Sequence, residues 1–161
     1  MNPSPNIPVK TADDAIEALR QVVRGREDFV YRDTRRDADP YERCVNWTRE
    51  TPESEWQPSC VVGHVLMLWG FPDDLMDSCS ASGISVIRYD LNYMADPKSS
   101  KHREVPYEID FEAGVILTAA QATQDSEERL TWGRALEAAE WYYANPGSPM
   151  HLNPYCPESE K

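Results

Sequence analysis

The stretch from Ser59 to Gly70, SCVVGHVLMLWG, constrains the fold more than any other part of the chain. Ser59 is a favourable N-cap residue, and Gly70 stands where helices commonly end in a left-handed residue. Only His64 is polar between them, so a helix here is apolar on every side and has to be buried. The run is too short to cross a bilayer, which takes about 20 apolar residues. A strand is the competing interpretation, but the caps favour a buried central helix.

The rest of the chain predicts a mainly α fold. Helical signals also mark residues 11–24, 110–124 and 127–144. Thr11 and Asp110 are N-cap candidates, and the last segment spaces its apolar residues at i, i+3, i+4 and i+7. We therefore expect a compact helical domain of about four helices around the buried central helix (59–70).

Several shorter segments are predicted less uniquely. Residues 29–31 and 44–47 are strand candidates that could pair as a small antiparallel β-hairpin (28–47). Residues 71–76 look like a short helix, with Pro72 at an early position and acidic residues after it. Residues 84–94 are apolar but ambiguous between helix and strand.

The chain is long enough for one domain that buries about two thirds of its unfolded surface. Its organisation is predicted as a flexible lead-in (1–10), a single globular domain (11–145) and a Pro-rich extended or disordered tail (146–161). Two glycines inside helices, Gly63 and Gly133, each cost about 1 kcal/mol relative to Ala. We expect close backbone contacts between helices to compensate, including one between these two glycines. The predicted core consists of Val62, Val65, Leu66, Trp69, Leu117, Trp132, Leu136 and Ala139.

Charge and cysteine usage exclude several classes of protein. The net charge of −12 argues against a general binder of nucleic acid or anionic membranes. The four cysteines have no paired spacing, and the first residues lack the apolar core of a signal peptide. No segment predicts a membrane span or a lipid anchor. These features predict a protein of the reducing cytoplasm with mostly free thiols.

The charge is also unevenly distributed. Residues 20–50 carry eight Arg against seven acidic residues, whereas residues 104–161 carry eleven acidic residues against three basic ones. This asymmetry predicts an acidic face and a mixed, Arg-bearing face. A mixed face can also be an ordinary surface of salt bridges.

Cys60 is the most suggestive residue for chemistry. It lies at a helix start, where the helix dipole stabilises a thiolate, and His64 follows one turn later. Asp125 could orient the imidazole as the third member of a triad. The alternative is a small buried Cys60 and a core His64 bonded to Gln121 or Asp125. No oxyanion loop or nucleophile signature supports catalysis, so no catalytic residue is assigned.

Metal and cofactor sites are not predicted. Cys60 and His64 do not form a zinc signature, even with Cys44 and His102 as further ligands. No phosphate-binding or dinucleotide-binding motif is present. Gln121, Gln124 and Asp125 form a polar cluster where two helices meet. Its expected role is to satisfy helix ends, and a ligand pocket is the alternative.

Two segments resemble a known pattern. PSCVVGHVL at 58–66 is followed by LTAAQATQDSEERLTWGRALEAAE at 117–140. The combination is similar to small uncharacterised accessory proteins of actinobacteriophages, including mycobacteriophages. The resemblance covers the middle and C-terminal helices but not residues 67–116. It implies a phage-encoded cytoplasmic protein and carries no implication for chemistry.

Three classes of function remain open. The first, which we prefer, is an interaction protein that binds and modulates an unidentified host protein through an exposed apolar or aromatic patch. The second is an acidic decoy that imitates DNA, which requires carboxylates spread over one continuous surface. The third is a small Cys/His-dependent enzyme with an open pocket at Cys60. For the first, Arg32, Arg35 and Arg36 are the predicted binding residues, because they lie in a charged loop near several aromatic residues.

Overall fold

The computed structural model describes residues 6–31, 46–80, 82–126 and 130–155, and in this part of the chain the fold is mainly helical, as predicted. The helices are α1 (Ala12–Val23), α2 (Val61–Leu68), α3 (Asp73–Cys79), α4 (Ile84–Ala95), α5 (Phe111–Gln124) and α6 (Trp132–Ala144), with a 3-10 turn, η1 (Met150–Leu152). The strands are β1 (Val9–Lys10), β2 (Trp47–Thr48), β3 (Gln57–Pro58) and β4 (Glu108–Ile109).

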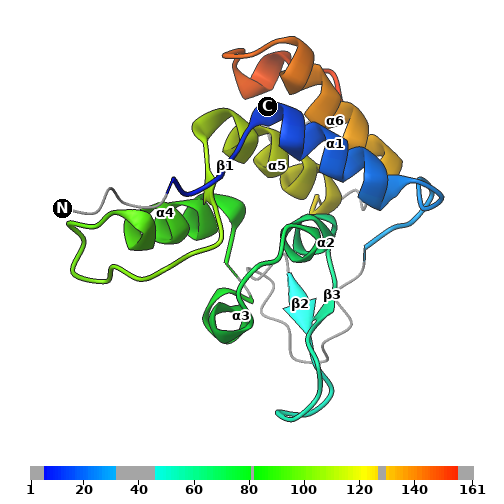
Figure 1. Ribbon diagram of the computed structural model, residues 1–161. Helices are drawn as coiled ribbons and strands as arrows, with labels where there is room; N and C mark the ends of the chain where they lie inside the picture. The colour runs from blue at the N-terminus through cyan, green and yellow to red at the C-terminus, as the bar shows by residue number, and fades with distance from the viewer. Residues whose placement is uncertain (1–5, 32–45, 81, 127–129, 156–161) are drawn as a thin grey trace.

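Helices α1, α5 and α6 lie side by side, and α2 crosses below them (Figure 1). Helix α5 contacts α1, α2, α4 and α6, so it joins α1 and α6 to α2 and α4. Both α5 and α6 bury several small residues, which allow neighbouring helices to approach closely. The buried alanines are Ala113, Ala119 and Ala120 of α5 and Ala135, Ala138 and Ala139 of α6.

Helix α2 is the predicted buried helix, with a corrected start. Cys60, rather than Ser59, is the N-cap, and its sulfur accepts the N–H of Gly63. The predicted end is confirmed: Gly70 has φ +79°, its N–H donates to Met67, and the N–H of Phe71 donates to Leu66. These two bonds form a Schellman motif, which satisfies the last carbonyls of the helix.

The predicted core is present. Six of its eight members are buried, and Trp69 and Leu136 are partly buried against the same cluster. Most of α2 is buried, but His64 and Met67 are half-buried and Leu68 is 47% exposed. The hydrophobic cluster extends from Ala15 of α1 to Tyr142 of α6.

Gly63 and Gly133 contact loops rather than each other, which corrects the expected helix–helix contact. A Cβ atom added to Gly63 would lie 1.7 Å from the backbone oxygen of Asn46. A Cβ atom added to Gly133 would lie 2.9 Å from the backbone oxygen of Glu27, which accepts the Gly133 N–H. Both glycines therefore admit a neighbouring backbone to a helix surface.

A small antiparallel sheet is present, but its strands differ from the expected hairpin. Strand β2 pairs with β3 across the connection 49–56. Val30 forms an isolated antiparallel bridge with Thr131, and residues 32–45 lie outside the described part of the chain. Strands β1 and β4 pair in parallel, so residues 9–10 of the expected lead-in are held by the domain.

Two helices and the start of the tail become definite. The ambiguous segment 84–94 is helix α4, and the helix expected over 127–144 begins at Trp132, with Thr131 as its N-cap. The first half of the expected tail docks on the domain. There the side-chain amide of Asn153, which is fully buried, donates to the backbone oxygen of Ala138 at 3.0 Å.

Candidate functional site

Cys60 occupies a closed, structural position. Its side chain is fully buried, its sulfur accepts the N–H of Gly63 at 3.3 Å, and its S–H donates to Oδ1 of Asn46 at 3.4 Å. A thiol that donates its proton to an amide oxygen is in the neutral form, which is not nucleophilic. The geometry therefore supports the buried alternative and not the open pocket that an enzyme requires.

His64 is bonded to the backbone of Cys60 and not to its sulfur. The ring atom Nδ1 lies 2.9 Å from the Cys60 carbonyl oxygen, and the ring meets Trp132 edge-on with 5.1 Å between centroids. Because a carbonyl only accepts, Nδ1 carries the proton in the neutral ring. Loss of solvation lowers the pKa of His64; the Cys60 carbonyl opposes this shift, and the nearby charge of Arg26 adds to it.

Asp125 does not complete a triad with these residues. It caps the C-terminus of α5, and its Oδ1 accepts a hydrogen bond from Nε2 of Gln124 at 2.8 Å. The hydrogen bonds of Cys60 and His64 within the described residues join neither the sulfur to the imidazole nor the imidazole to Asp125. Chemistry by the three candidates is therefore not supported by their geometry.

The polar cluster on α5 satisfies the starts of other helices. Oε1 of Gln124 accepts the N–H of Val61, the first residue of α2, at 2.8 Å, and Nε1–H of Trp132 at 2.9 Å. Oε1 of Gln121 accepts the N–H of Ile84, the first residue of α4, at 3.1 Å. The cluster thus satisfies helix ends, as expected, and the ends that it satisfies are the starts of α2 and α4.

Asn46 ties the loop before β2 to three further segments. Its side-chain amide donates to the carbonyls of Cys79 at 3.0 Å and Ser82 at 2.8 Å. Its backbone oxygen accepts the N–H of Ser59 at 2.8 Å. Asn46 is fully buried, so this network fixes the approach of α2 to the end of α3.

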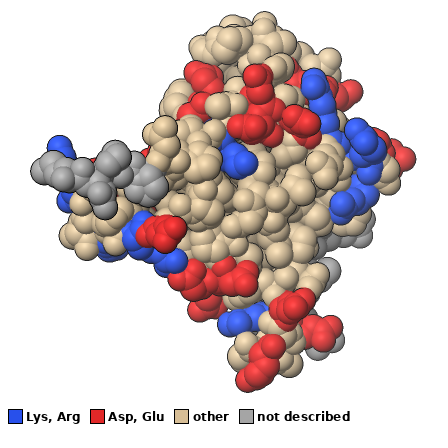
Figure 2. Space-filling view, viewed as in Figure 1, with Lys and Arg blue, Asp and Glu red and all other residues tan. Residues whose placement is uncertain are grey.

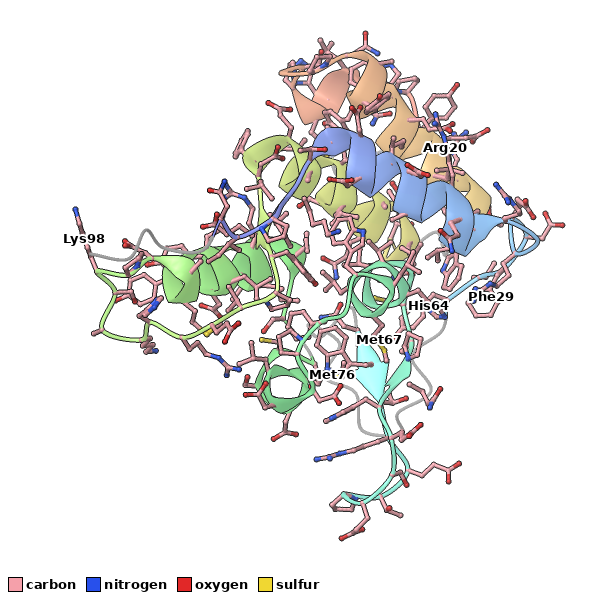
Figure 3. The ribbon with its side chains drawn as sticks, viewed as in Figure 1. Arg20, Phe29, His64, Met67, Met76 and Lys98 are labelled. Carbon is pink, nitrogen blue, oxygen red and sulfur yellow. The ribbon has the colours of Figure 1, made fainter. Side chains whose placement is uncertain are left out.

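Arg32, Arg35 and Arg36, the predicted binding residues, lie outside the described residues, as does Cys44. The described flank of that loop contacts Trp132, where the Phe29 ring packs edge-on at 4.7 Å and the Arg26 guanidinium lies 5.4 Å from the ring centroid. Figure 3 shows Phe29 and His64 on the same side of the molecule, where both flank this tryptophan.

An exposed aromatic surface lies on α4 and was not identified from the sequence. Val86, Tyr89 and Tyr93 project from one side of this helix and are 50%, 64% and 36% exposed. We call these three residues the α4 outer face. The two tyrosine rings are stacked, with centroids 5.9 Å apart and planes 6° apart. The signal was available: the three residues follow i, i+3 and i+7, opposite buried Ile84, Ile87 and Leu91.

The α4 outer face ends at the loop 96–103, DPKSSKHR, which is locally basic. The hydroxyl groups of Tyr93 and Ser100 are 3.3 Å apart, and Lys98 and Lys101 of the same loop are exposed. Neither lysine side chain forms a salt bridge with a described residue. Figure 3 places Lys98 at the far end of this loop, on the other side of the molecule from His64.

Within the described residues, no three His, Cys, Asp or Glu side chains come together in a group that could hold a metal ion. None of the described helices combines the length and the apolar character that crossing a membrane requires. Comparison of the chain with protein-family models, with curated proteins and with solved structures gave no match.

Proposed function

We propose that this protein is a phage-encoded cytoplasmic protein that binds a host protein and modulates it, and that the α4 outer face forms part of the contact. The observation that carries the proposal is the row of three exposed apolar side chains on one helix, two of them stacked tyrosines. Tyrosine is among the residues that most often dominate binding energy at interfaces. A patch of this kind is what an interaction protein requires and what an enzyme or a decoy does not.

The partner surface has a defined chemistry. It is apolar where it covers Tyr89 and Tyr93 and carries carboxylates opposite Lys98 and Lys101. These two lysines form no salt bridge with a described residue and offer positive charge in the loop that follows the tyrosines, in a chain whose net charge is −12. Arg32, Arg35 and Arg36 are proposed to make further contacts with the same host protein.

The two alternatives have less support. An enzyme that depends on Cys60 needs an accessible thiolate, whereas the sulfur is buried and bonded at both sides. A DNA-like decoy needs one continuous acidic surface. On the face shown in Figure 2, carboxylates gather over α1 and α6 and again near α3, and the surface between them is largely uncharged but includes basic side-chain atoms.

Capture from a lysate of the actinobacterial host tests the proposal. The tagged full chain is compared with a Tyr89→Ser/Tyr93→Ser variant and with Leu68→Ser, a control that removes exposed apolar surface from α2. We expect one host protein to be captured by the wild type and the control but at least about tenfold less by the double variant, because aromatic anchors carry much of the energy. An Arg32→Ala/Arg35→Ala/Arg36→Ala variant should also capture less.

A photo-crosslinking amino acid in place of Tyr89 gives an independent readout. It should join the chain to that same host protein. Capture that is equal for the wild type and the double variant contradicts the proposal. A crosslink only to a second copy of the chain also contradicts it, and would identify the α4 outer face as a self-association surface.

A further inference from the structure

A second surface lies beside the α4 outer face. Helices α4 and α5 and the turn η1 enclose a groove of about 170 Å³ with an almost wholly apolar lining. We call it the Arg88 groove. Its walls include Arg88 of α4, Phe111, Gly114 and Val115 of α5, and Met150 of η1. Phe111, at the rim, is 65% exposed, which is unusual for so large an apolar side chain on a helix of the core.

Arg88 is held in the wall of this groove by three contacts. Its Nε–H donates to the backbone oxygen of Ile109 at 3.0 Å, and its guanidinium lies 5.6 Å from the centroid of the Phe111 ring. Its stem passes so close to Gly114 that a Cβ atom there would lie 2.9 Å from Cδ of Arg88. The glycine therefore makes room for the arginine, and the position of its charge is fixed before any partner arrives.

The charge of Arg88 has no counter-ion within the described residues. The residue is half-buried, and the salt bridges of the described chain join other pairs. Nε is satisfied by a neutral carbonyl, which leaves the terminal nitrogens to an outside acceptor. A partly desolvated guanidinium gains most from a carboxylate, because the planar fork of donors matches two carboxylate oxygens.

We propose that the Arg88 groove binds a segment of the partner protein in which a large apolar side chain stands next to an Asp or Glu. The apolar side chain enters the groove beside Phe111 and Val115, and the carboxylate pairs with Arg88. The size fits one such side chain, since a cavity of roughly 150 Å³ accepts a molecule as large as benzene. This inference rests on the proposed function, because it assumes that the ligand is a protein.

Capped dipeptides test the groove without knowledge of the partner. N-acetyl-Phe-Glu-amide is titrated into the full ¹⁵N-labelled chain, and the amide signals of Gly114, Val115 and Thr118 are followed by NMR. We expect saturable shifts in the millimolar range. N-acetyl-Phe-Gln-amide should bind about tenfold more weakly, because it lacks the charge-assisted hydrogen bond to Arg88.

Three variants locate the effect. Arg88→Gln should abolish the difference between the Glu and Gln peptides. Arg24→Gln removes one exposed charge elsewhere and should preserve that difference. Ser85→Leu adds an apolar side chain at the exposed edge of the groove and should block both peptides without changing any charge. Ser85→Leu keeps the test decisive if Arg88→Gln fails to fold.

Other outcomes overturn the inference. Equal affinity for the Glu and Gln peptides shows that no carboxylate is recognised. Tighter binding of N-acetyl-Phe with a free C-terminal carboxylate shows that a chain end, rather than an acidic side chain, is the ligand. Absence of shifts at the groove with any peptide shows that it is not a binding site. The capture experiment on Tyr89 and Tyr93 would still decide the proposed function independently.

Discussion

The backbone oxygen of Asn46 lies against the Cα atom of Gly63, so closely that a methyl group there would be 1.7 Å from it. The same oxygen accepts the N–H of Ser59 at 2.8 Å. Asn46 also accepts the S–H of Cys60 through its side chain. Asn46, which is buried, therefore fixes the start of α2 and also packs directly against Gly63 inside that helix.

Gly63→Ala should consequently be among the most destabilising single-methyl additions in the chain. The new methyl group would have to displace a hydrogen-bonded backbone, and overpacking of this kind costs about 1–3 kcal/mol or more. Chemical denaturation measures the change. Gly83→Ala is the control, because its Cβ would meet only Oε1 of Gln121 at 3.9 Å. The control should change stability by no more than about 1 kcal/mol. A Gly63→Ala variant as stable as the wild type would contradict the close contact.

Two leucines of α2 provide a matched test of burial. Leu66 is fully buried, whereas Leu68, two residues later on the same helix, is 47% exposed. Leu66→Ala should lower the free energy of unfolding by about 2–5 kcal/mol, because it removes buried methyl groups and leaves a cavity. Leu68→Ala should cost less than about 1 kcal/mol, since about half of its surface is already in water. Similar unfolding midpoints for the two variants would show that α2 is not packed as described.

The role of Cys60 can be tested through its thiol. In the native protein, Cys60 should react with an alkylating reagent only as fast as the protein opens, because its side chain is fully buried. Mass spectrometry of the peptide that contains Cys60, with and without denaturant, measures this rate. Cys60→Ser should fold, since a hydroxyl also accepts the helix N–H, and should still capture the host protein. Rapid native alkylation together with loss of all biological effect in the folded variant would favour the enzyme.

The elements that the sequence predicts well are those whose signals are local. Thr11 caps α1 with a capping box, Asp110 caps α5 through the N–H of Ala113, and Gly70 ends α2 in the left-handed region. Each of these signals involves residues within one turn of the helix end. The periodic stripe around Trp132 likewise predicts α6, although not its first residue.

The start of α4 could not be found in this way. Its N-cap residue, Gly83, makes no side-chain cap, and its first N–H is satisfied by Gln121, 37 positions away. Its β-branched residues also favour a strand. The Arg88 groove lies between this helix and α5, so it could not be predicted without the position of α4.

A long-range contact also explains why Cys60 rather than Ser59 is the N-cap of α2. Serine is the preferred cap by composition, yet the backbone N–H of Ser59 is bonded to Asn46, which keeps that residue in the extended path of β3. Cys60 then occupies the cap position, and Asn46 accepts its S–H. A contact across 14 positions decided between neighbouring residues.

His64 gives the protein a stability that depends on pH. Burial favours its neutral ring, so its pKa in the folded state lies below the usual value of about 6.5. Between the folded and the unfolded pKa the unfolded chain binds more protons, and stability therefore rises with pH in this interval. The contribution of His64 is fully present above about pH 6.5 and is lost as the pH falls through the folded pKa.

His64→Asn isolates this effect, because the Asn side-chain amide can still donate to the Cys60 carbonyl and carries no titratable group. Denaturant unfolding of both proteins at about pH 7.5 and about pH 5.5 gives the difference in stability at each pH. The wild type should lose more stability than the variant on acidification, since protonation of its imidazole opposes burial beside Trp132. Carboxylates that titrate in the same interval affect both proteins and cancel in the difference. An equal loss in the two proteins would mean that His64 is solvated as well in the folded state as in the unfolded one.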